Sequence, residues 1–331
     1  MNSEKYSGIW IFAEQSGGVI HPAVFELLAK AQQLKAHSGE IITAVLLGSN
    51  VRQLADALIA RGAEQVIVAE APGLELYSAR PYQQALAQLA EKYKPSILLY
   101  GATSIGRDLA PRLMISLKTG LTADAIDLGF DEDGVFYQTT PGYGGKIFAH
   151  IVINEKRPQM ATVRPQMFEP LEADASRRGT VITEHVTVEA DSCYELLGES
   201  PKSGDGTSPE EAAVLVSGGR GIKNEGQLAL LKDLAAAVGG QVCGSRPLIE
   251  SGLLPHRVQL GQSGLTVKPE LIINVAVSGA VQYRVGMQGA KHIISINKDP
   301  RAAIFDISNG AAVADYTTLI PAIIAEIKKR R

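Results

Sequence analysis

The sequence predicts an α/β protein of two domains, each built on a mostly parallel sheet flanked by helices. Short, continuously apolar segments alternate with amphipathic segments of helical spacing, which is typical of parallel strands joined by right-handed crossovers. Glycine and alanine are plentiful and aromatic residues are sparse, which suits close packing of helices on a sheet. The chain of 331 residues is long enough for two such domains, each with its own core.

The first domain is expected over residues 1–198. It begins with a buried strand at residues 8–13, after which strands and helices alternate. The next expected strands are 41–47, 65–69 and 96–100, and the expected helices are 22–36, 51–61 and 81–93. Alternating strands and glycine turns then predict an antiparallel extension of the sheet, with strands at 135–140, 146–153 and 160–163. The charged segment that follows contains one more alternating strand, near 181–188.

The segment of residues 199–211 is the predicted linker. It is rich in Ser, Pro and Gly and has almost nothing to bury. The second domain therefore occupies residues 212–331. Its expected strands are 212–216, 241–243, 271–277 and 292–296, and its clearest helix is 225–238.

Charge and cysteine content exclude several classes of function. The formal net charge of −3 gives no basic surface for nucleic acid or for insertion into an anionic membrane. Cys193 and Cys243 lie far apart without metal-ligand spacing, so we expect reduced thiols and no metal site. No segment has the pattern of a signal peptide or the length of a membrane-spanning helix, so we expect a cytoplasmic protein.

The stretch from residue 271 to residue 296 organises the second domain. Its first strand runs into Ser278-Gly279-Ala280-Val281-Gln282-Tyr283. A small-residue turn before a helix is a common anion site, because glycine lets a ligand approach the backbone and the first amides are free. A plain joint between strand and helix explains one such turn equally well. Two other segments share the design, Ser217-Gly218-Gly219-Arg220-Gly221 and Gly244-Ser245-Arg246, and all three are expected at one sheet edge.

The turn that contains Arg220 is not an ordinary nucleotide motif. It lacks the full G-x-G-x-x-G spacing, and no acidic residue follows the next strand, which disfavours an NAD-binding unit. It also lacks the Gly-Lys-Ser/Thr of a P-loop. Arg220 is suited to meet a pyrophosphate, although an arginine that simply faces water fits the same turn.

Further donors follow the other strands of the second domain. Leu260-Gly261-Gln262-Ser263 offers uncharged donors, which suit a neutral heterocycle better than a metal. Asn297 follows the strand at 292–296, and Asp315 with Tyr316 follows the next apolar segment. An acid at that edge can bind a ribose hydroxyl, but an aspartate also commonly caps a turn or helix.

Taken together, these segments resemble the alpha subunit of electron transfer flavoprotein. The resemblance covers the second domain in the right order. It runs through Ser217-Gly218-Gly219-Arg220-Gly221, Gly244-Ser245-Arg246, Gly261-Gln262-Ser263-Gly264, Ser278-Gly279-Ala280-Val281-Gln282, Asn297-Lys298-Asp299-Pro300 and Val313-Ala314-Asp315. In the first domain it is carried by Gly106-Arg107-Asp108 and by Arg157-Pro158-Gln159-Met160-Ala161-Thr162-Val163-Arg164-Pro165.

The resemblance implies a Rossmann-like FAD-binding domain at residues 212–331 and a first domain that contacts a beta subunit in a heterodimer. It implies an electron carrier of the bacterial cytoplasm rather than a stand-alone enzyme. Such a carrier accepts electrons from dehydrogenases, for example acyl-CoA dehydrogenases, and passes them to a downstream acceptor. The run from Arg157 to Pro165 resembles a subgroup from anaerobes, some of which bifurcate electrons from NADH through a second FAD in the beta subunit.

Two alternatives to an electron carrier find less support in the sequence. An NAD-dependent enzyme on a related dinucleotide-binding fold is disfavoured, because the sequence offers no base–nucleophile constellation. A non-catalytic scaffold would not need so many donors at one sheet edge. The predicted cofactor-binding residues are Arg220, Ser245, Arg246, Leu260, Gly261, Gln262, Ser263, Ser278, Gly279, Ala280, Val281, Gln282, Tyr283, Asn297, Asp315 and Tyr316.

By family likeness, each part of FAD has its own group of residues. Arg220 and the residues from Ser278 to Gln282 face the pyrophosphate, while Asn297 and Asp315 lie toward the adenosine. The residues around or near the isoalloxazine ring are Ser245, Arg246, Gln262 and Ser263. A fixed guanidinium near the ring stabilises its negatively charged reduced form, so Arg246 is expected to make the largest electrostatic contribution to the redox potential.

Two positions depart from the common family pattern. Ser263 stands where threonine is common, which keeps the hydroxyl that we expect to donate to the ring edge. Tyr283 stands where histidine is common. A neutral phenol can donate to the ring but cannot offset a full negative charge, so we expect weaker stabilisation of the charged flavin than with histidine.

Overall fold

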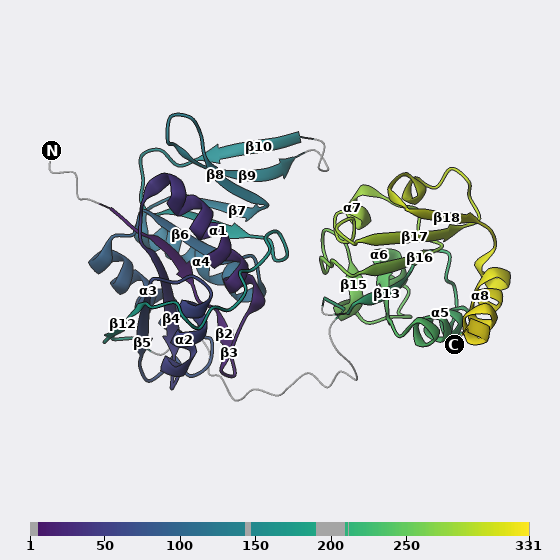
Figure 1. Cartoon of the computed structure of the whole chain (residues 1–331), viewed down its shortest axis with the longest axis horizontal. Helices are drawn as coiled ribbons and strands as arrows, with labels where there is room; N and C mark the ends of the chain where they lie inside the picture. Colours follow the sequence, from purple (N-terminus) through teal and green to yellow (C-terminus); the bar gives the residue numbers. More distant parts are fainter. Residues whose placement is uncertain (1–5, 143–146, 190–208, 211, 331) are drawn as a thin grey trace. The chain divides into compact units, whose positions relative to one another are not determined.

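The computed structural model describes residues 6–142, 147–189, 209–210 and 212–330. The chain divides into two compact units, Met1–Gly198 and Glu199–Arg331 (Figure 1). Each unit has a parallel sheet with helices packed against it, which confirms the predicted α/β class. The predicted linker at 199–211 lies outside the described residues except at 209–210.

The sheet of the first unit has seven parallel strands in the order β12-β5-β4-β1-β6-β11-β7. The strands are β1 (Ile9–Phe12), β4 (Ile42–Gly48), β5 (Gln65–Glu70), β6 (Ile97–Gly101), β7 (Leu121–Ala125), β11 (Gln159–Val163) and β12 (Thr180–Glu184). All four residues of β1 are buried, because the strand is central and both faces of the sheet are covered.

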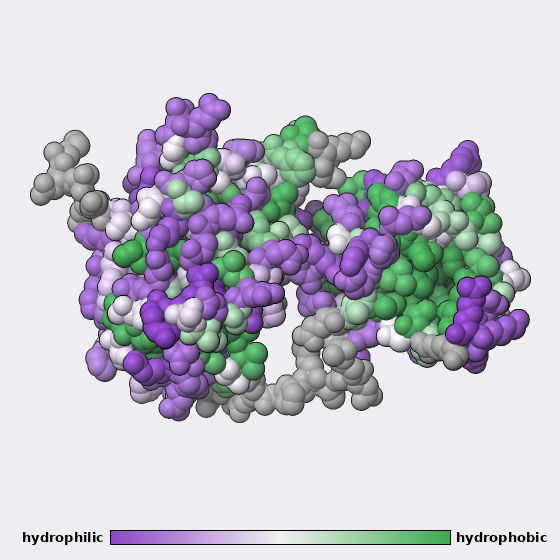
Figure 2. All heavy atoms as spheres, in the orientation of Figure 1, coloured by the Kyte–Doolittle hydropathy of each residue, from purple (hydrophilic) through white to green (hydrophobic). Residues whose placement is uncertain are grey.

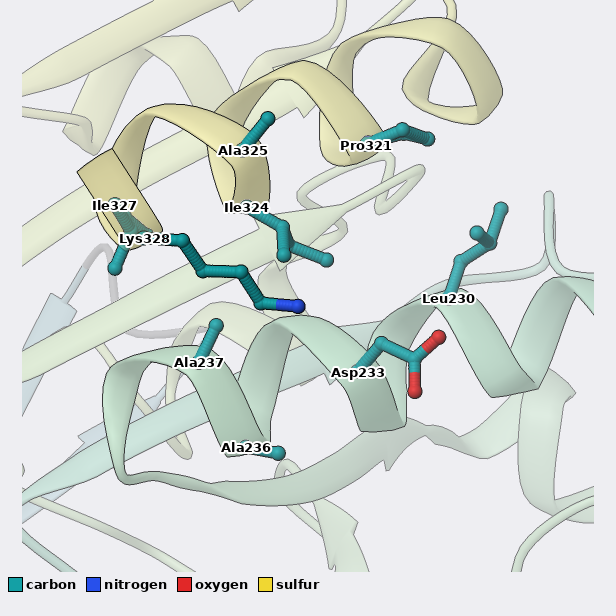
Figure 3. A pocket seen from close by; sticks show the side chains of 9 residues that line it. All are labelled: Leu230, Asp233, Ala236, Ala237, Pro321, Ile324, Ala325, Ile327 and Lys328. Atoms are coloured by element: carbon teal, nitrogen blue, oxygen red, sulfur yellow. The ribbon is translucent and has the colours of Figure 1, made fainter.

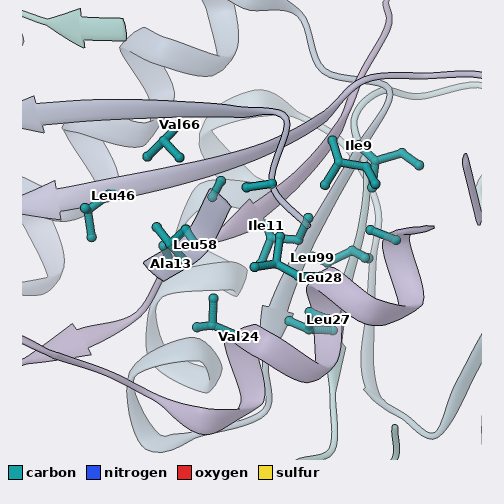
Figure 4. Packing of buried hydrophobic residues seen from close by; sticks show 14 of the residues in the cluster. Ile9, Ile11, Ala13, Val24, Leu27, Leu28, Leu46, Leu58, Val66 and Leu99 are labelled. Carbon is teal, nitrogen blue, oxygen red and sulfur yellow. The ribbon is translucent and has the colours of Figure 1, made fainter. Parts of the chain in front are cut away.

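Four helices cover the two faces of this sheet. One face packs against α1 (Pro22–Ser38) and α2 (Ala55–Ala60), and the other against α3 (Ala79–Tyr93) and α4 (Ser104–Leu117). Figure 4 shows the first of these cores, where side chains of β1, α1 and neighbouring strands interdigitate. The helix expected at 51–61 is divided into a 3-10 turn, Arg52–Leu54, and α2.

A separate antiparallel sheet contains β8 (Asp127–Phe130), β9 (Phe136–Gly142) and β10 (Ile147–Val152). A two-strand ribbon, β2 (Gln15–Ser16) and β3 (Val19–Ile20), follows β1. The expectation that residues 160–163 join the antiparallel extension is wrong. They form β11, which lies parallel between β6 and β7, and its five residues are all buried as in a central strand.

The sheet of the second unit has six parallel strands in the order β15-β14-β13-β16-β17-β18. They are β13 (Val214–Gly218), β14 (Gln241–Ser245), β15 (Gln259–Leu260), β16 (Leu271–Val275), β17 (His292–Asn297) and β18 (Gly310–Val313). Counted along the chain, this is the strand order of a doubly wound dinucleotide-binding fold. The order of the strands reverses between β13 and β16, and a ligand is expected at that point.

Helices cover one face of the second sheet, and short turns cover the other. The helices on the first face are α5 (Glu225–Val238), α6 (Arg246–Glu250) and α8 (Tyr316–Arg330). Aliphatic residues of α5 and α8 line a shallow pocket between the two helices (Figure 3). The opposite face packs against the four-residue α7 (Val281–Arg284) and the 3-10 turn Ala303–Ile307, and a further 3-10 turn, His256–Val258, precedes β15. The helix expected after Ser278 is therefore a single turn.

The described part of the chain contains no helix that is long and apolar enough to span a membrane. Hydrophobic residues are nevertheless exposed on β10, where Ile147 and Phe148 keep 55% and 58% of their surface. Figure 2 shows hydrophobic atoms on the first unit in the region of β10.

Candidate cofactor-binding site

A pocket of about 1140 Å³ lies at the carboxyl ends of five strands of the second sheet. All these strands are parallel, so the residues that come after them meet at one edge. The pocket spans the point between β13 and β16 where the strand order reverses. Its volume lies just above the usual range for small-molecule sites, about 300–1,000 Å³, which suits a ligand as large as a dinucleotide.

Most of the predicted site residues line this pocket. They are Arg220, Ser245, Arg246, Leu260, Gly261, Gln262, Ser263, Ser278, Ala280, Gln282, Tyr283 and Asn297. Gly279 and Val281 belong to the same loop but are not in the lining, and Asp315 and Tyr316 lie at the start of α8. The lining residues that the sequence did not predict are Gly221, Lys223, Pro247, Ala276, Val277, Asp299 and Ala302. All of them except Ala302 lie within three residues of a predicted residue, so their position in the sequence could have indicated them.

The loop from Ser278 to Gln282 presents a row of backbone amides. None of these five amides donates a hydrogen bond within the described chain. Gly279 has a φ of +82°, and a Cβ there would lie 2.1 Å from the backbone nitrogen of Ile304. Only glycine fits such a close approach, so the residue fixes the loop against the segment that follows β17. Clustered free amides of this kind bind anions.

The loop after β15 is hydrogen-bonded to the loop of residues 278–282. The amide of Gln262 donates to the carbonyl oxygen of Gln282 at 2.7 Å. Gly261 has a φ of +130°, and a Cβ there would lie 2.6 Å from the same oxygen. The side chains of Gln262 and Gln282 have no hydrogen-bond partner among the described residues, so their amide groups are available to a ligand.

One end of the pocket is positively charged. Arg220 and Lys223 are exposed in the turn after β13, and within the described residues neither side chain has an ion-pair partner. Asp299 is the only acidic residue of the lining, and its carboxylate accepts the Arg301 amide at 2.9 Å. Two unpaired cations beside free amides suit a diphosphate group.

Arg246 and Ser245 lie where β14 meets α6. The Arg246 side chain is exposed, and its Nε donates to Glu250 Oε1 at 2.7 Å. Ser245 is the N-cap residue of α6, but its side chain makes no capping bond. The hydroxyl of Ser263 accepts from Gln259 Nε2 at 3.0 Å, which holds the turn after β15. The guanidinium that the sequence predicts as a fixed charge is thus held by a neighbouring carboxylate.

Tyr283 differs from its expected role as a donor to the cofactor ring. Its side chain is buried, and its hydroxyl lies 2.7 Å from Ser217 Oγ and 2.5 Å from Asn274 Oδ1. Burial, with a smaller contribution from the Cys243 thiol, raises the pKa of Tyr283 well above its usual value. The phenol is therefore neutral, and the hydroxyl of this lining residue satisfies two buried polar groups of the protein.

The last three predicted residues stabilise the rim. Asn297 Nδ2 donates to the Val277 carbonyl at 2.8 Å, and the hydroxyl of Tyr316 donates to the Gly221 carbonyl at 3.2 Å. Asp315 accepts from the amide and hydroxyl of Thr317, and these bonds lower the pKa of its carboxyl. Asp315 thus caps the first turn of α8, and cofactor contact by Asp315 and Tyr316 stays a prediction.

Two family models match this chain. Residues 9–189 match the electron transfer flavoprotein domain, and residues 209–288 match the electron transfer flavoprotein FAD-binding domain. The electron transfer flavoprotein subunit alpha of Thermoanaerobacterium thermosaccharolyticum is 42% identical over 98% of both chains. This chain belongs to the electron transfer flavoprotein alpha-subunit family. The family identity makes FAD the cofactor of the second unit and electron transfer its role.

Other relatives of this alpha-subunit family match over nearly the whole chain. The electron transfer flavoprotein subunit alpha of Megasphaera elsdenii is 40% identical over 100% of this chain and 99% of its own. A protein of Acetobacterium woodii named lactate dehydrogenase (NAD(+),ferredoxin) subunit LctC is 39% identical, over 99% of this chain and 78% of its own.

The chemistry of the pocket fits FAD. Cations and free amides at one end suit the diphosphate, and the uncharged amide groups of Gln262 and Gln282 suit the carbonyls and nitrogens of the ring. Within the described ranges, no group of three His, Cys, Asp or Glu side chains is placed to hold a metal ion.

Proposed function

We propose that this chain is the FAD-binding subunit of a heterodimer that accepts electrons from dehydrogenases, such as acyl-CoA dehydrogenases, and passes them to a downstream acceptor. The observation that carries the proposal is the pocket at the strand ends of the second unit. Its lining combines Arg220 and Lys223, which have no ion-pair partner among the described residues, with uncharged donors and with Arg246, which is paired with Glu250.

In this proposal each side of the pocket binds one part of FAD. Arg220, Lys223 and the amides of residues 278–282 bind the diphosphate, which anchors the cofactor by charge-assisted hydrogen bonds. Asn297 and Asp315 lie toward the adenosine. Bound FAD supplies the chemistry of one- and two-electron transfer.

The ring end is tuned by the residues after β14 and β15. Ser245, Arg246, Gln262 and Ser263 surround the isoalloxazine, and the positive charge of Arg246 favours its reduced, negatively charged form. The lining has no histidine, cysteine or glutamate, and the carboxylate of its one aspartate, Asp299, accepts the Arg301 amide. This supports an electron carrier over the alternative, an NAD-dependent enzyme that transforms an organic substrate.

A beta subunit is the proposed partner of the first unit. The exposed apolar residues of β10 are Ile147 (55%), Phe148 (58%), Ile151 (39%) and Val152 (44%). Soluble proteins seldom leave such a contiguous apolar strand in water, and patches of this kind mark subunit interfaces. We propose that the beta subunit covers this strand.

Electron bifurcation is a second candidate for the fate of the electrons. The name of the Acetobacterium woodii relative includes both NAD(+) and ferredoxin, which supports a bifurcating assembly. The test is to purify the full chain with its beta subunit and count flavins per heterodimer. Two flavins support bifurcation and one supports a simple relay, while a heterodimer that stays colourless after FAD is added contradicts the whole proposal.

A further inference from the structure

A row of buried polar side chains crosses the second sheet beneath the pocket. Ser217, Asn274 and Ser295 are register partners on β13, β16 and β17, and each is completely buried. Partners in register lie on the same face of a sheet, here the face that packs against α7. Asn274 Nδ2 donates to Ser295 Oγ at 3.2 Å, and Ser295 Oγ lies 2.8 Å from Ser308 Oγ. The row therefore connects three neighbouring strands.

Tyr283 closes this row from the pocket side. Asn274 Oδ1 can only accept, so the phenol donates to it and accepts from the Ser217 hydroxyl. The rest of the Tyr283 ring packs among apolar residues such as Leu260 and Met287. Its position in the fold is thus fixed by two hydrogen bonds and by apolar packing.

The backbone of the same residue continues the pocket loop. Tyr283 directly follows Gln282, whose carbonyl oxygen accepts the amide of Gln262 at 2.7 Å. The free amides of residues 278–282 end at this point. Whatever fixes Tyr283 therefore fixes both the loop of amides and its bond to the loop after β15.

We propose that Tyr283 is a positioning residue. Its hydroxyl anchors the loop of residues 278–282 to β13 and β16, and so places the amides that bind the cofactor. The phenol makes no contact with the flavin ring. The inference rests on the proposed FAD pocket, but the anchor itself is a property of the protein without its cofactor.

The test is amide hydrogen exchange of the full chain with its beta subunit, measured without FAD. Tyr283→Phe keeps the ring and removes the hydroxyl, which leaves Asn274 Oδ1 and Ser217 Oγ buried with one bond fewer. We expect exchange at the hydrogen-bonded amides of residues 283–286 and of Gln262 to become about tenfold faster. Ser217 lies outside the pocket lining, and Ser217→Ala is also expected to make amide exchange faster at the same residues. This second variant keeps the test available if Tyr283→Phe fails to fold.

Tyr100→Phe is the matched control. Tyr100 is completely buried in the first unit, and its hydroxyl has no hydrogen-bond partner in the described chain. Removing that hydroxyl leaves exchange at Gln262 and residues 283–286 unchanged.

FAD supplies a second readout that separates an anchor from a flavin contact. For Tyr283→Phe we expect the FAD dissociation constant to rise about threefold to tenfold. The one-electron reduction potential of the flavin that binds moves by less than about 20 mV, equivalent to a twofold change in the equilibrium constant of a one-electron step.

Unchanged exchange at Gln262 and residues 283–286 in both folded variants overturns the proposal, and so does a shift in potential larger than about 20 mV. Failure of the unmodified protein to bind FAD contradicts the proposed function alone, because the exchange comparison needs no cofactor.

Discussion

Arg246 donates from Nε to Glu250 Oε1 at 2.7 Å, one helical turn further along α6. Both side chains are mostly exposed, 67% and 60%, so the pair is screened by water. The pair matters because Arg246 also lines the pocket. In the proposed arrangement, with Arg246 beside the flavin ring, Glu250 offsets part of the positive charge that Arg246 places there.

Glu250→Gln is predicted to raise the flavin reduction potential. Removing the carboxylate leaves the guanidinium uncompensated, and a rise of roughly 10–40 mV corresponds to the strength of an exposed ion pair. Redox titration of the heterodimer measures it. Glu326→Gln is the control, because Glu326 forms the same type of pair with Arg330 on α8, outside the pocket lining. A potential that is unchanged or lower in Glu250→Gln contradicts the assignment of Arg246 to the ring end.

Arg220→Ala and Lys223→Ala are each predicted to weaken FAD binding about tenfold, because each removes a charge-assisted bond to the diphosphate. The loss is larger at low ionic strength, since salt screens exposed charges. Fluorescence titration with FAD at two salt concentrations measures it. Lys232→Ala, an exposed lysine of α5 outside the lining, is the control. Equal affinity in the control and the two pocket variants would place the diphosphate elsewhere.

Glu14→Gln is predicted to stabilise the first unit at neutral pH. Glu14 is buried and accepts the Thr103 hydroxyl at 2.6 Å, and burial raises the pKa of its carboxyl above the usual value. A raised pKa means that the charged form opposes folding, so stability is lost as the pH rises through the folded pKa. Thermal unfolding should show the variant more stable near pH 8, with the difference shrinking toward about pH 5. A constant difference across this range contradicts the prediction.

Phe148→Ser is predicted to weaken the heterodimer without destabilising the isolated chain. The side chain is 58% exposed, so its replacement removes little buried surface from the chain itself. If the beta subunit covers β10, the variant loses an apolar contact and the dissociation constant rises about tenfold. Analytical ultracentrifugation measures this. Val19→Ser, an exposed apolar residue of β3, should leave the dimer unchanged.

The alternating pattern predicted the strands and helices well where local signals agree with the packing. Helix α5 has the predicted bounds, because Asn224 caps its start and Gly239 ends it with a φ of 68°. Strand β11 was assigned to the wrong sheet. Its residues follow a hairpin along the chain, and sequence proximity carries no information about a crossover that inserts the strand between β6 and β7.

The sequence could not predict the directions in which the side chains of the candidate site point. The strand ends identified the pocket residues, since parallel strands bring their succeeding loops to one edge of the sheet. The pairing of Arg246 with Glu250 follows from helical spacing and was accessible in principle. The hydrogen bonding of the Tyr283 hydroxyl could not be predicted, because it depends on the strand register that places Ser217 beside Asn274.

The most direct test of the central claim is FAD titration of Ala280→Trp against the unmodified chain, each with its beta subunit. Ala280 lines the pocket, its side chain is exposed, and its φ of −54° suits any residue, so the indole fills the cavity without disturbing the fold. We predict that the unmodified protein binds FAD and turns yellow, while the variant stays folded and binds at least about a hundredfold more weakly. Equal FAD affinity in the two proteins would contradict the assignment of this pocket to the cofactor.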